Sequence, residues 1–390
     1  ALSTLGQRDR SMDVLLSAAA AYDAALSVRS KKDDPLKWAA TQNNLGLVLE
    51  NIGERKGETA TLNKAKTAYE AALTVYSPLD TPYEWSTAQN NLGAVLQSIG
   101  QMENGTATLE KAAAVFEAAI AKRSRDDDPI GWGTTQNNLA NVLSIVGDRE
   151  LGTDSLKKAV NAYEAALSAL TRERAPVQWA TIQSNLGTTL NRVGEREGGT
   201  EAFIKAVSAF EASLSERTRE RAPLDWAQTE NNLGTTLYRI GEQEKDSANL
   251  HKAIAAYELA LTEITPEKVP LLWATIQNNL GSAYRTLGER ELSEEWLAKA
   301  IAAYEAALTE RTRDRTAYDW AMTQDNLGWA RMWYGLRTHS KAEILSGRKS
   351  VEDARDLLKA GGYNYDEYFK NRLANFDLAL NLLEQQTQKP

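Results

Sequence analysis

The chain has 390 residues, a formal net charge of −8 at pH 7, no cysteine and two histidines. The acidic balance argues against general nucleic-acid binding, which selects basic faces. The lack of cysteine excludes disulfides, thiolate nucleophiles and Cys-ligated zinc, and two histidines leave little material for His-based catalysis or a metal site. No apolar run approaches the ~18 residues that a membrane helix needs. We therefore expect a soluble, cytoplasmic protein with no cofactor, no metal and no membrane contact.

An internal repeat of 47 residues organises the chain. Prolines, leucines and glycines follow the same register without insertion or deletion. A unit of this length is too small to be a domain, so about eight units form an array. The register is set by seven of the ten tryptophans: Trp38, Trp85, Trp132, Trp179, Trp226, Trp273 and Trp320.

Each unit is predicted to hold two amphipathic helices. The first, over about 35–52, starts at Asp34-Pro35, where Asp caps the helix and Pro fills its first position. It ends at Gly53, where a left-handed residue terminates a helix easily. Its buried stripe consists of Trp38, Thr41, Leu45, Leu49 and Ile52, which recur at helical steps.

The second helix starts near Thr59 and carries its own apolar face. No segment alternates with period two, so no strand is expected. Two amphipathic helices cannot bury their stripes alone, and stacked pairs therefore predict an α-solenoid. The apolar face of the second helix comprises Leu62, Ala65, Tyr69, Ala72 and Leu73.

These residues resemble a known family. Asn44-Leu45-Gly46, followed by Leu49, Gly53, Ala65, Tyr69 and Ala72-Leu73, is similar to the tetratricopeptide repeat (TPR), a helix-turn-helix unit of usually 34 residues. The longer loops are similar to those of the kinesin light chain type. The resemblance covers about 6–354 and departs at the tryptophan, which stands two helical turns before Leu45 where the family usually has it one turn before.

The resemblance implies an all-α, right-handed α-solenoid (superhelix) of about eight TPR-like repeats. A HEAT-like solenoid of similar period is the alternative, but it does not explain the recurring small residues at Gly46, Ala65 and Ala72.

The two ends of the array differ from its middle. Residues 1–336 are predicted to form the repeat array, and we expect its first repeat to be truncated, with 1–5 as the tail of a first helix. The second helix around 15–26 then keeps a partly exposed apolar stripe, so we expect further repeats upstream or end-to-end self-association through this N-terminal face. Residues 337–390 form a degenerate last repeat and a capping helix, whose apolar positions are Phe369, Leu373, Phe376, Leu380 and Leu383.

One asparagine recurs in every unit, although asparagine is a mediocre helix former. By helical phase it lies at the edge opposite Gly46. In the family this face lines a concave groove, where asparagine bonds the backbone of extended peptides. A ladder that links repeat to repeat is the other interpretation, and both can hold together. The row is Asn44, Asn91, Asn138, Asn185, Asn232, Asn279 and Asn326.

Variable positions beside this row should carry specificity. Arg192, Tyr238, Arg239 and Arg285 form a basic, aromatic stretch in an otherwise acidic protein, and arginine suits carboxylates and phosphates. The alternative is that these arginines pair with nearby glutamates. Trp329 and Trp333 are predicted to pack on the capping helix.

No catalytic or nucleotide-binding motif is present in the sequence. We therefore expect a non-enzymatic scaffold that binds an extended, acidic peptide segment of a partner protein in its groove. The alternative is a structural spacer, regulatory or self-assembly arm of a larger multidomain protein. A hydrolase or transferase has no residues that could be named.

Overall fold

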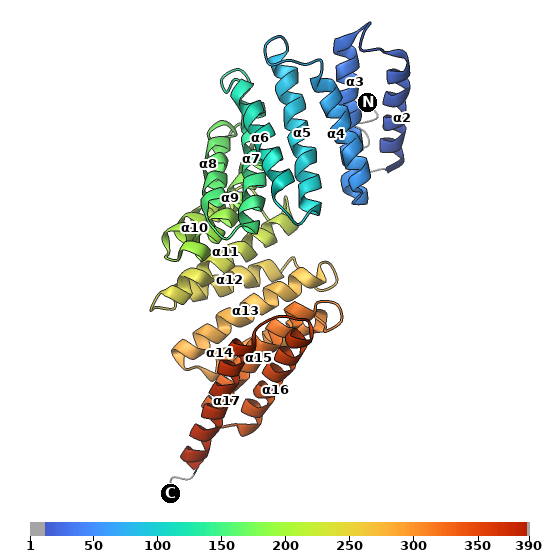
Figure 1. Ribbon diagram of the computed structural model, residues 1–390. Coiled ribbons are helices and arrows are strands. Elements are labelled where there is room, and N and C mark those ends of the chain that lie inside the picture. Colours follow the sequence, from blue (N-terminus) through green and yellow to red (C-terminus); the bar gives the residue numbers. More distant parts are fainter. Residues whose placement is uncertain (1–11, 388–390) are drawn as a thin grey trace. The chain divides into compact units, whose positions relative to one another are not determined.

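The computed structural model describes residues 12–387, and every regular element within them is an α-helix (Figure 1). The chain divides into two compact units, 1–198 and 199–390. The predicted all-α architecture of helix-turn-helix repeats is confirmed. The first unit contains α2 (Met12–Val28), α3 (Pro35–Lys56), α4 (Thr59–Leu73), α5 (Pro82–Met102), α6 (Ala107–Lys122), α7 (Pro129–Arg149), α8 (Asp154–Ala169) and α9 (Pro176–Glu197). The second contains α10 (Glu201–Leu214), α11 (Pro223–Gln243), α12 (Ala248–Leu261), α13 (Pro270–Glu291), α14 (Glu294–Glu310), α15 (Ala317–Arg337), α16 (Lys341–Ala360) and α17 (Asp366–Thr387).

The first helix of each repeat, called helix A below, bears an odd number, and the second, helix B, an even number. Helix A begins at proline in six repeats, and the Asp34 carboxylate accepts the backbone N–H of Lys37 at 3.2 Å, as expected for a cap. It ends about one turn later than expected, since α3 continues to Lys56. Gly53 is thus inside the helix. A Cβ there would lie 2.7 Å from Leu62, so this glycine allows close approach of helix B and does not end helix A.

A second glycine fixes the contact between the two helices of a repeat. A Cβ on Gly46 would lie 2.7 Å from the ring of Tyr69, and a Cβ on Gly93 would lie 2.7 Å from the ring of Phe116. Both rings are fully buried. Gly46 therefore faces helix B, and the close packing explains why glycine recurs here despite its cost in a helix.

The repeated tryptophan lies differently from the expectation. All seven tryptophans, Trp179 among them, are half-buried, whereas the small residue that follows each one, such as Ala180, is buried. A cation from the preceding loop lies over the exposed side of several rings, with Arg172 at 5.7 Å from the centroid of Trp179. The small residue is needed because helix B packs close by: a Cβ on Gly133 would lie 2.8 Å from Leu170.

An arginine at the end of helix A joins successive repeats. Arg149 donates to the carbonyl oxygens of Gly100 at 2.9 Å and Gly105 at 2.6 Å, at the end of the preceding helix A and in the loop after it. Arg196 donates to the equivalent oxygens of Gly147 and Gly152, both at 2.6 Å. These bonds satisfy carbonyls that a helix end leaves without partners and complement its dipole.

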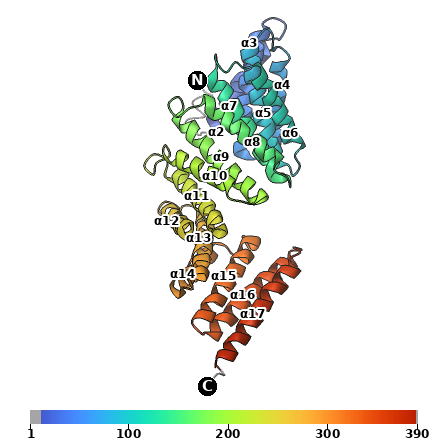
Figure 2. The ribbon, with the colours of Figure 1, turned by 90° about the vertical axis from the view of Figure 1, so that its left-hand side faces the viewer.

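At the C-terminal end, α15, α16 and α17 pack side by side (Figure 2). Phe369, Phe376 and Leu383 of α17 are buried there, and the ring of Trp329 lies 6.3 Å from that of Phe376. The predicted packing of Trp329 on the last helix is confirmed by this contact, and Trp333 packs against the same cluster of α15, α16 and α17 residues. The predicted boundary at 336 falls at the end of α15.

At the N-terminal end, α2 packs on α3 through the buried Leu15 and Ala18, with Tyr22 and Leu26 half-buried. The predicted tail of a first helix over 1–5 lies outside the described residues.

A buried carboxyl predicts a pH-dependent stability. Glu50 is 7% exposed and accepts a hydrogen bond from the Tyr69 hydroxyl at 2.6 Å, and burial raises its pKa to about 7. Because the folded state prefers the protonated acid, this contribution to stability is full below about pH 4.5 and is lost as the pH rises through about 7. Glu50→Gln should thus match the wild type at pH 5 and be more stable by about 2–4 kcal/mol at pH 8.

The measurement is urea unfolding at both pH values, with the exposed Glu117→Gln on α6 as the control. A Glu50→Gln protein that is no more stable than the wild type at pH 8 would contradict the assignment of a buried acid.

Candidate functional site

The asparagine row forms a ladder between repeats. The Asn91 side-chain amide donates to Asn43 Oδ1 at 3.1 Å, and Asn138 donates to Asn90 at 3.1 Å. The second unit has the same pattern, with Asn279 to Asn231 at 3.4 Å and Asn326 to Asn278 at 3.3 Å. Asn44 is exposed and the other six members of the row are half-buried. The ladder interpretation is thus seen directly, and ligand binding by the same amides stays a prediction.

The ladder changes at the fourth repeat, although the usual acceptor for Asn185, Asn137, is present in the sequence. The fourth repeat has Ser184 at the position of Asn43. In this repeat Asn185 donates to Asn141 Oδ1 at 3.2 Å, one helical turn from the usual acceptor. Asn137 Oδ1, which the usual pattern would have used, is buried without a hydrogen-bond partner. In the second unit, Asn232 accepts from its neighbour Asn231 at 3.3 Å.

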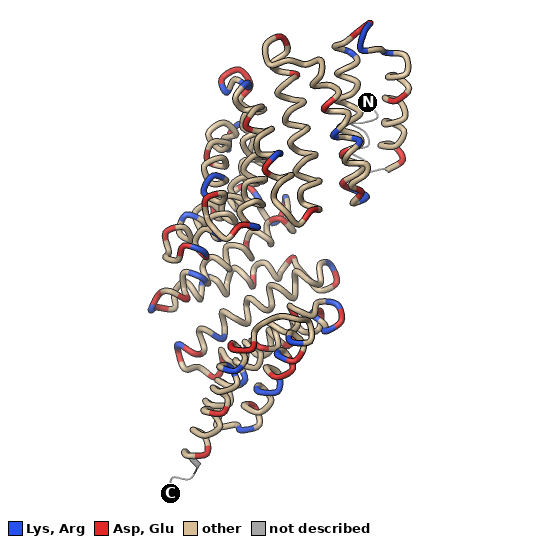
Figure 3. Tube along the Cα trace, viewed as in Figure 1, with Lys and Arg blue, Asp and Glu red and all other residues tan. Residues whose placement is uncertain are grey.

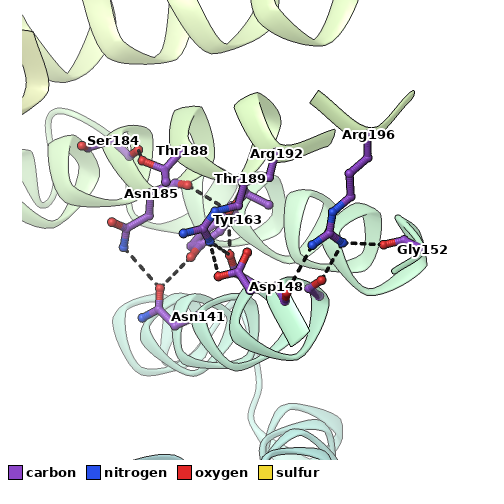
Figure 4. Close-up of polar contacts among 12 residues, drawn as sticks. Asn141, Asp148, Gly152, Tyr163, Ser184, Asn185, Thr188, Thr189, Arg192 and Arg196 are labelled. Carbon is purple, nitrogen blue, oxygen red and sulfur yellow. Dashed lines mark hydrogen bonds and ion pairs between the residues drawn. The ribbon is translucent and has the colours of Figure 1, made fainter. Parts of the chain in front are cut away.

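A hollow of about 290 Å³ opens beside this irregular step. Figure 4 shows the polar contacts around Asn141, Asn185 and Arg192 at this place. It lies on the A-helix face of the first unit, between α5, α7 and α9, with one residue from α8. Its walls carry four carboxamides, four hydroxyls and one guanidinium. They are formed by Gln97, Gln101, Asn141, Ser144, Ile145, Tyr163, Asn185, Thr188, Thr189 and Arg192.

Small side chains create the hollow. Ser144 Oγ and Thr189 Oγ1 lie 3.1 Å apart, and both side chains are short enough to leave space above them. In the second unit, the positions equivalent to Ser144 carry larger side chains, namely Tyr238, Arg285 and Met332, whereas those equivalent to Thr188 carry Thr235, Ser282 and Trp329. The combination of a small residue at both positions in adjacent repeats, as at Ser144 and Thr188, therefore does not recur there.

The polar walls are already organised by hydrogen bonds. The Tyr163 hydroxyl donates to Asn141 Oδ1 at 2.7 Å, and the Asn185 amide donates to the same oxygen. These bonds hold the Asn185 side chain in place, so its remaining N–H and its oxygen have a fixed direction. Two further carboxamides, Gln97 and Gln101, complete the rim.

The single cation of the hollow is paired with an acid. Arg192 Nη1 lies 2.5 Å from Asp148 Oδ2, and their side chains are 38% and 33% exposed. Arg192 also lies 3.4 Å from Ser144 Oγ. Burial raises the pKa of Asp148, and Arg192 and Arg196 oppose that rise. The hollow therefore presents a neutral pair and not a free positive charge.

The other predicted specificity residues lie in the second unit. Tyr238 is 8% exposed, and its hydroxyl donates to Glu242 at 2.7 Å. Arg239 forms an ion pair with Glu242 at 3.0 Å, and Arg285 pairs with Glu289 one turn along its own helix. Each predicted arginine thus has an acidic partner.

Charges of both signs are interleaved in each unit (Figure 3). Among residues 12–387, no group of three or more His, Cys, Asp or Glu side chains could hold a metal ion. No helix in the described part of the chain is long and apolar enough to cross a membrane.

Sequence reasoning missed most of the walls of the hollow. Asn185 and Arg192 were predicted site residues, but Asn141, Tyr163 and Thr189 were not. The available signal was a coincidence of small hydroxyl residues in neighbouring repeats, with Ser144, Thr188 and Thr189 all next to the asparagine row.

A comparison with protein-family models gives one match. The sequence model of the tetratricopeptide repeat matches residues 273–310, which include all of α14 and most of α13. No curated protein matches the chain.

Three solved structures are similar at low identity. BtubC (BKLC) from P. vanneervenii is 19% identical with a TM-score of 0.46, over 65% of this chain and 92% of that one. A tetratricopeptide repeat protein from Parabacteroides merdae is 15% identical with a TM-score of 0.45, over 86% and 98%. YrrB, described as a TPR protein with an unusual peptide-binding site, is 19% identical with a TM-score of 0.37, over 57% and 90%.

The matched segment lies within one of the 47-residue units, and its glycine, leucine and tyrosine positions recur through the array as helix pairs. The chain therefore carries a tetratricopeptide repeat at residues 273–310, and its other units have the same construction.

Proposed function

We propose that the protein is a non-enzymatic, cytoplasmic interaction scaffold that binds an extended polypeptide segment of a partner on its A-helix face. The observation that carries the proposal is the polar hollow beside Asn185. It lies in line with the asparagine row, and its walls offer hydrogen bonds of both kinds. TPR repeats typically act as scaffolds of this sort.

The carboxamides suit a peptide backbone. Each amide offers two N–H donors and an acceptor oxygen, and the ladder bond of Asn185 uses one N–H. The rest can pair with the N–H and C=O of an extended ligand. Because such pairing does not depend on the ligand side chains, we expect the amides to supply most of the affinity and little of the selectivity.

An acidic ligand residue would face Arg192. To bind there, the ligand carboxylate must displace Asp148 from its ion pair with Arg192. The net gain in binding free energy is small, because one carboxylate replaces another. We therefore propose a preference for acidic segments, of modest size. Self-association through the N-terminal face stays a separate prediction, for which the half-buried Tyr22 and Leu26 of α2 are the candidate contacts.

Selection from a displayed library of random dodecapeptides tests the proposal. Asn185→Ala should weaken every selected peptide. Arg192→Gln should weaken only acidic peptides, by up to about five-fold, since a half-exposed ion pair contributes about 0–1 kcal/mol. Fluorescence anisotropy with labelled peptides measures both effects.

Lys158→Gln on α8 is the matched control, because it removes one exposed positive charge away from the hollow. The proposal is wrong if no peptide is enriched on the wild type over Asn185→Ala, or if Lys158→Gln and Arg192→Gln reduce binding equally.

A further inference from the structure

A position one to three residues after the end of each helix B from α2 to α14 alternates in character along the array. Every arginine at this position is matched by a threonine twelve residues later, and every apolar residue is matched by an apolar one. The pairs in chain order are Arg29 and Thr41, Tyr76 and Ala88, Arg123 and Thr135, Leu170 and Ile182, Arg217 and Thr229, Ile264 and Ile276, and Arg311 and Thr323. We call the arginine pairs polar junctions and the others apolar junctions.

At two of the four polar junctions, those of Arg123 and Arg311, the arginine bridges two successive A helices. Arg311 is 8% exposed, and it donates to Thr323 Oγ1 on α15 and to Thr275 Oγ1 on α13, both at 2.9 Å. Arg123 does the same in the first unit, with Thr135 on α7 at 3.2 Å and Thr87 on α5 at 2.7 Å. The two units therefore contain the same buried bridge.

The threonines are suited to accept these bonds. Thr135 donates its own proton to the Gly131 carbonyl at 2.9 Å, and Thr323 donates to the Asp319 carbonyl at 2.7 Å. Their lone pairs are thus left to face the guanidinium. Thr41 accepts from Arg29 in the same way at 3.0 Å. The buried Arg123 also forms an ion pair with Asp128 at 3.2 Å. A buried arginine is tolerated here because the threonine hydroxyls and this carboxylate compensate for the loss of water around the guanidinium.

An apolar junction offers no such acceptor at its centre. Leu170 and Ile182 are each 1% exposed, and Ile264 and Ile276 are 1% and 0% exposed. A guanidinium placed between such side chains would be buried without its bonds, which is costly. The two kinds of junction are therefore not interchangeable.

We infer that the array is built from blocks of two repeats, 94 residues long. In each block a buried arginine determines which kind of repeat can pack next to it, because the arginine needs a threonine on the neighbouring A helix. The inter-repeat surface of each A helix is then specific for a neighbour with the matching residue: threonine opposite arginine, aliphatic opposite aliphatic. Buried polar groups are known to set register in this way in other assemblies. The inference does not depend on the proposed peptide binding.

Conversion of one junction type into the other tests this inference in the full chain. Ile264→Arg should lower the urea midpoint strongly, because the new guanidinium faces Ile276. The double variant Ile264→Arg/Ile276→Thr should recover more than half of that loss. Gln228, at the α11 position equivalent to Thr275 on α13, can supply the second acceptor.

Ile264→Lys/Ile276→Thr is the matched control and should recover less, because an ammonium lacks the planar fork that reaches two acceptors. A double arginine variant no more stable than Ile264→Arg, or a lysine variant that recovers as much, would overturn the inference.

The existing polar junction gives a second arm that does not require a new buried charge. Thr323→Ile should lower the urea midpoint, since Arg311 loses one of two acceptors, and Arg311→Ile/Thr323→Ile should regain it. The double-mutant cycle measures this coupling. Additive effects of the two substitutions on the urea midpoint would contradict the inference.

Discussion

Replacement of Arg372 by alanine is expected to detach the C-terminal helix. Asp325 on α15 is 0% exposed and is held by Arg372 through Nε at 3.1 Å and Nη2 at 2.9 Å, and by the Tyr368 hydroxyl at 2.6 Å. The Arg372 guanidinium also lies 4.1 Å from the ring centroid of Trp329. Without the arginine a carboxylate is buried with its countercharge gone, which costs about 3–5 kcal/mol.

Hydrogen exchange is the suitable readout, because repeat arrays do not unfold as one cooperative unit. Arg372→Ala should accelerate amide exchange in α17 and leave α3–α8 unchanged. Arg355→Ala is the control, since Arg355 pairs with Asp356 at the surface at 2.8 Å. Unchanged protection of α17 in Arg372→Ala would show that the apolar contacts of Phe369 and Phe376 hold the helix without the ion pair.

Phe116→Ala is expected to destabilise the first unit by about 3–5 kcal/mol, as other large truncations in protein cores do. The ring is 0% exposed and fills the space against Gly93. Chemical unfolding followed by tryptophan fluorescence measures the loss. Leu79→Ala, at a side chain that is 86% exposed, should change stability by less than about 0.5 kcal/mol.

A second substitution shows whether the glycine and the ring form one contact. Gly93→Ala alone should destabilise, because its Cβ would lie 2.7 Å from Phe116. In the Phe116→Ala protein the same methyl group would enter the cavity and should be neutral or stabilising. Equal costs in both backgrounds would refute the contact.

The regular part of the fold was predictable because every unit repeats the same local rules. Asp34-Pro35 starts a helix because Asp caps the N-terminus and Pro suits the first helical position. Leu45 and Tyr69 recur at helical spacing. The end of helix A at Gly53 was predicted wrongly, because glycine serves both helix ends and close packing, and a single sequence does not distinguish the two. The burial of Trp38 was overestimated for a related reason: the small Ala39 beside it makes the deeper contact.

The hollow was harder to predict because no single repeat contains it. Its walls combine Gln97, Asn141 and Asn185 from three successive repeats, and its volume depends on the absence of bulk at Ser144 and Thr189. The helical phase of Asn185 predicted the side of helix A on which it lies, but it did not predict that a hollow opens beside it. It also gave no information on Asp148, which neutralises the Arg192 charge on which the expected acidic preference rested.

The interlocking of Gly93 with Phe116, and of Gly46 with Tyr69, also bears on how the protein responds to load. A hairpin of two helices in such close contact has little freedom to shear, so a stretched array should stay rigid within each repeat and yield between repeats. Once one helix pair opens, the aromatic ring of its helix B loses contact with the glycine of its helix A, and the whole repeat unfolds. A repeat of 47 residues would then release about 160 Å of chain at ~3.4 Å per residue, so the protein would lengthen in discrete steps and not as a smooth spring.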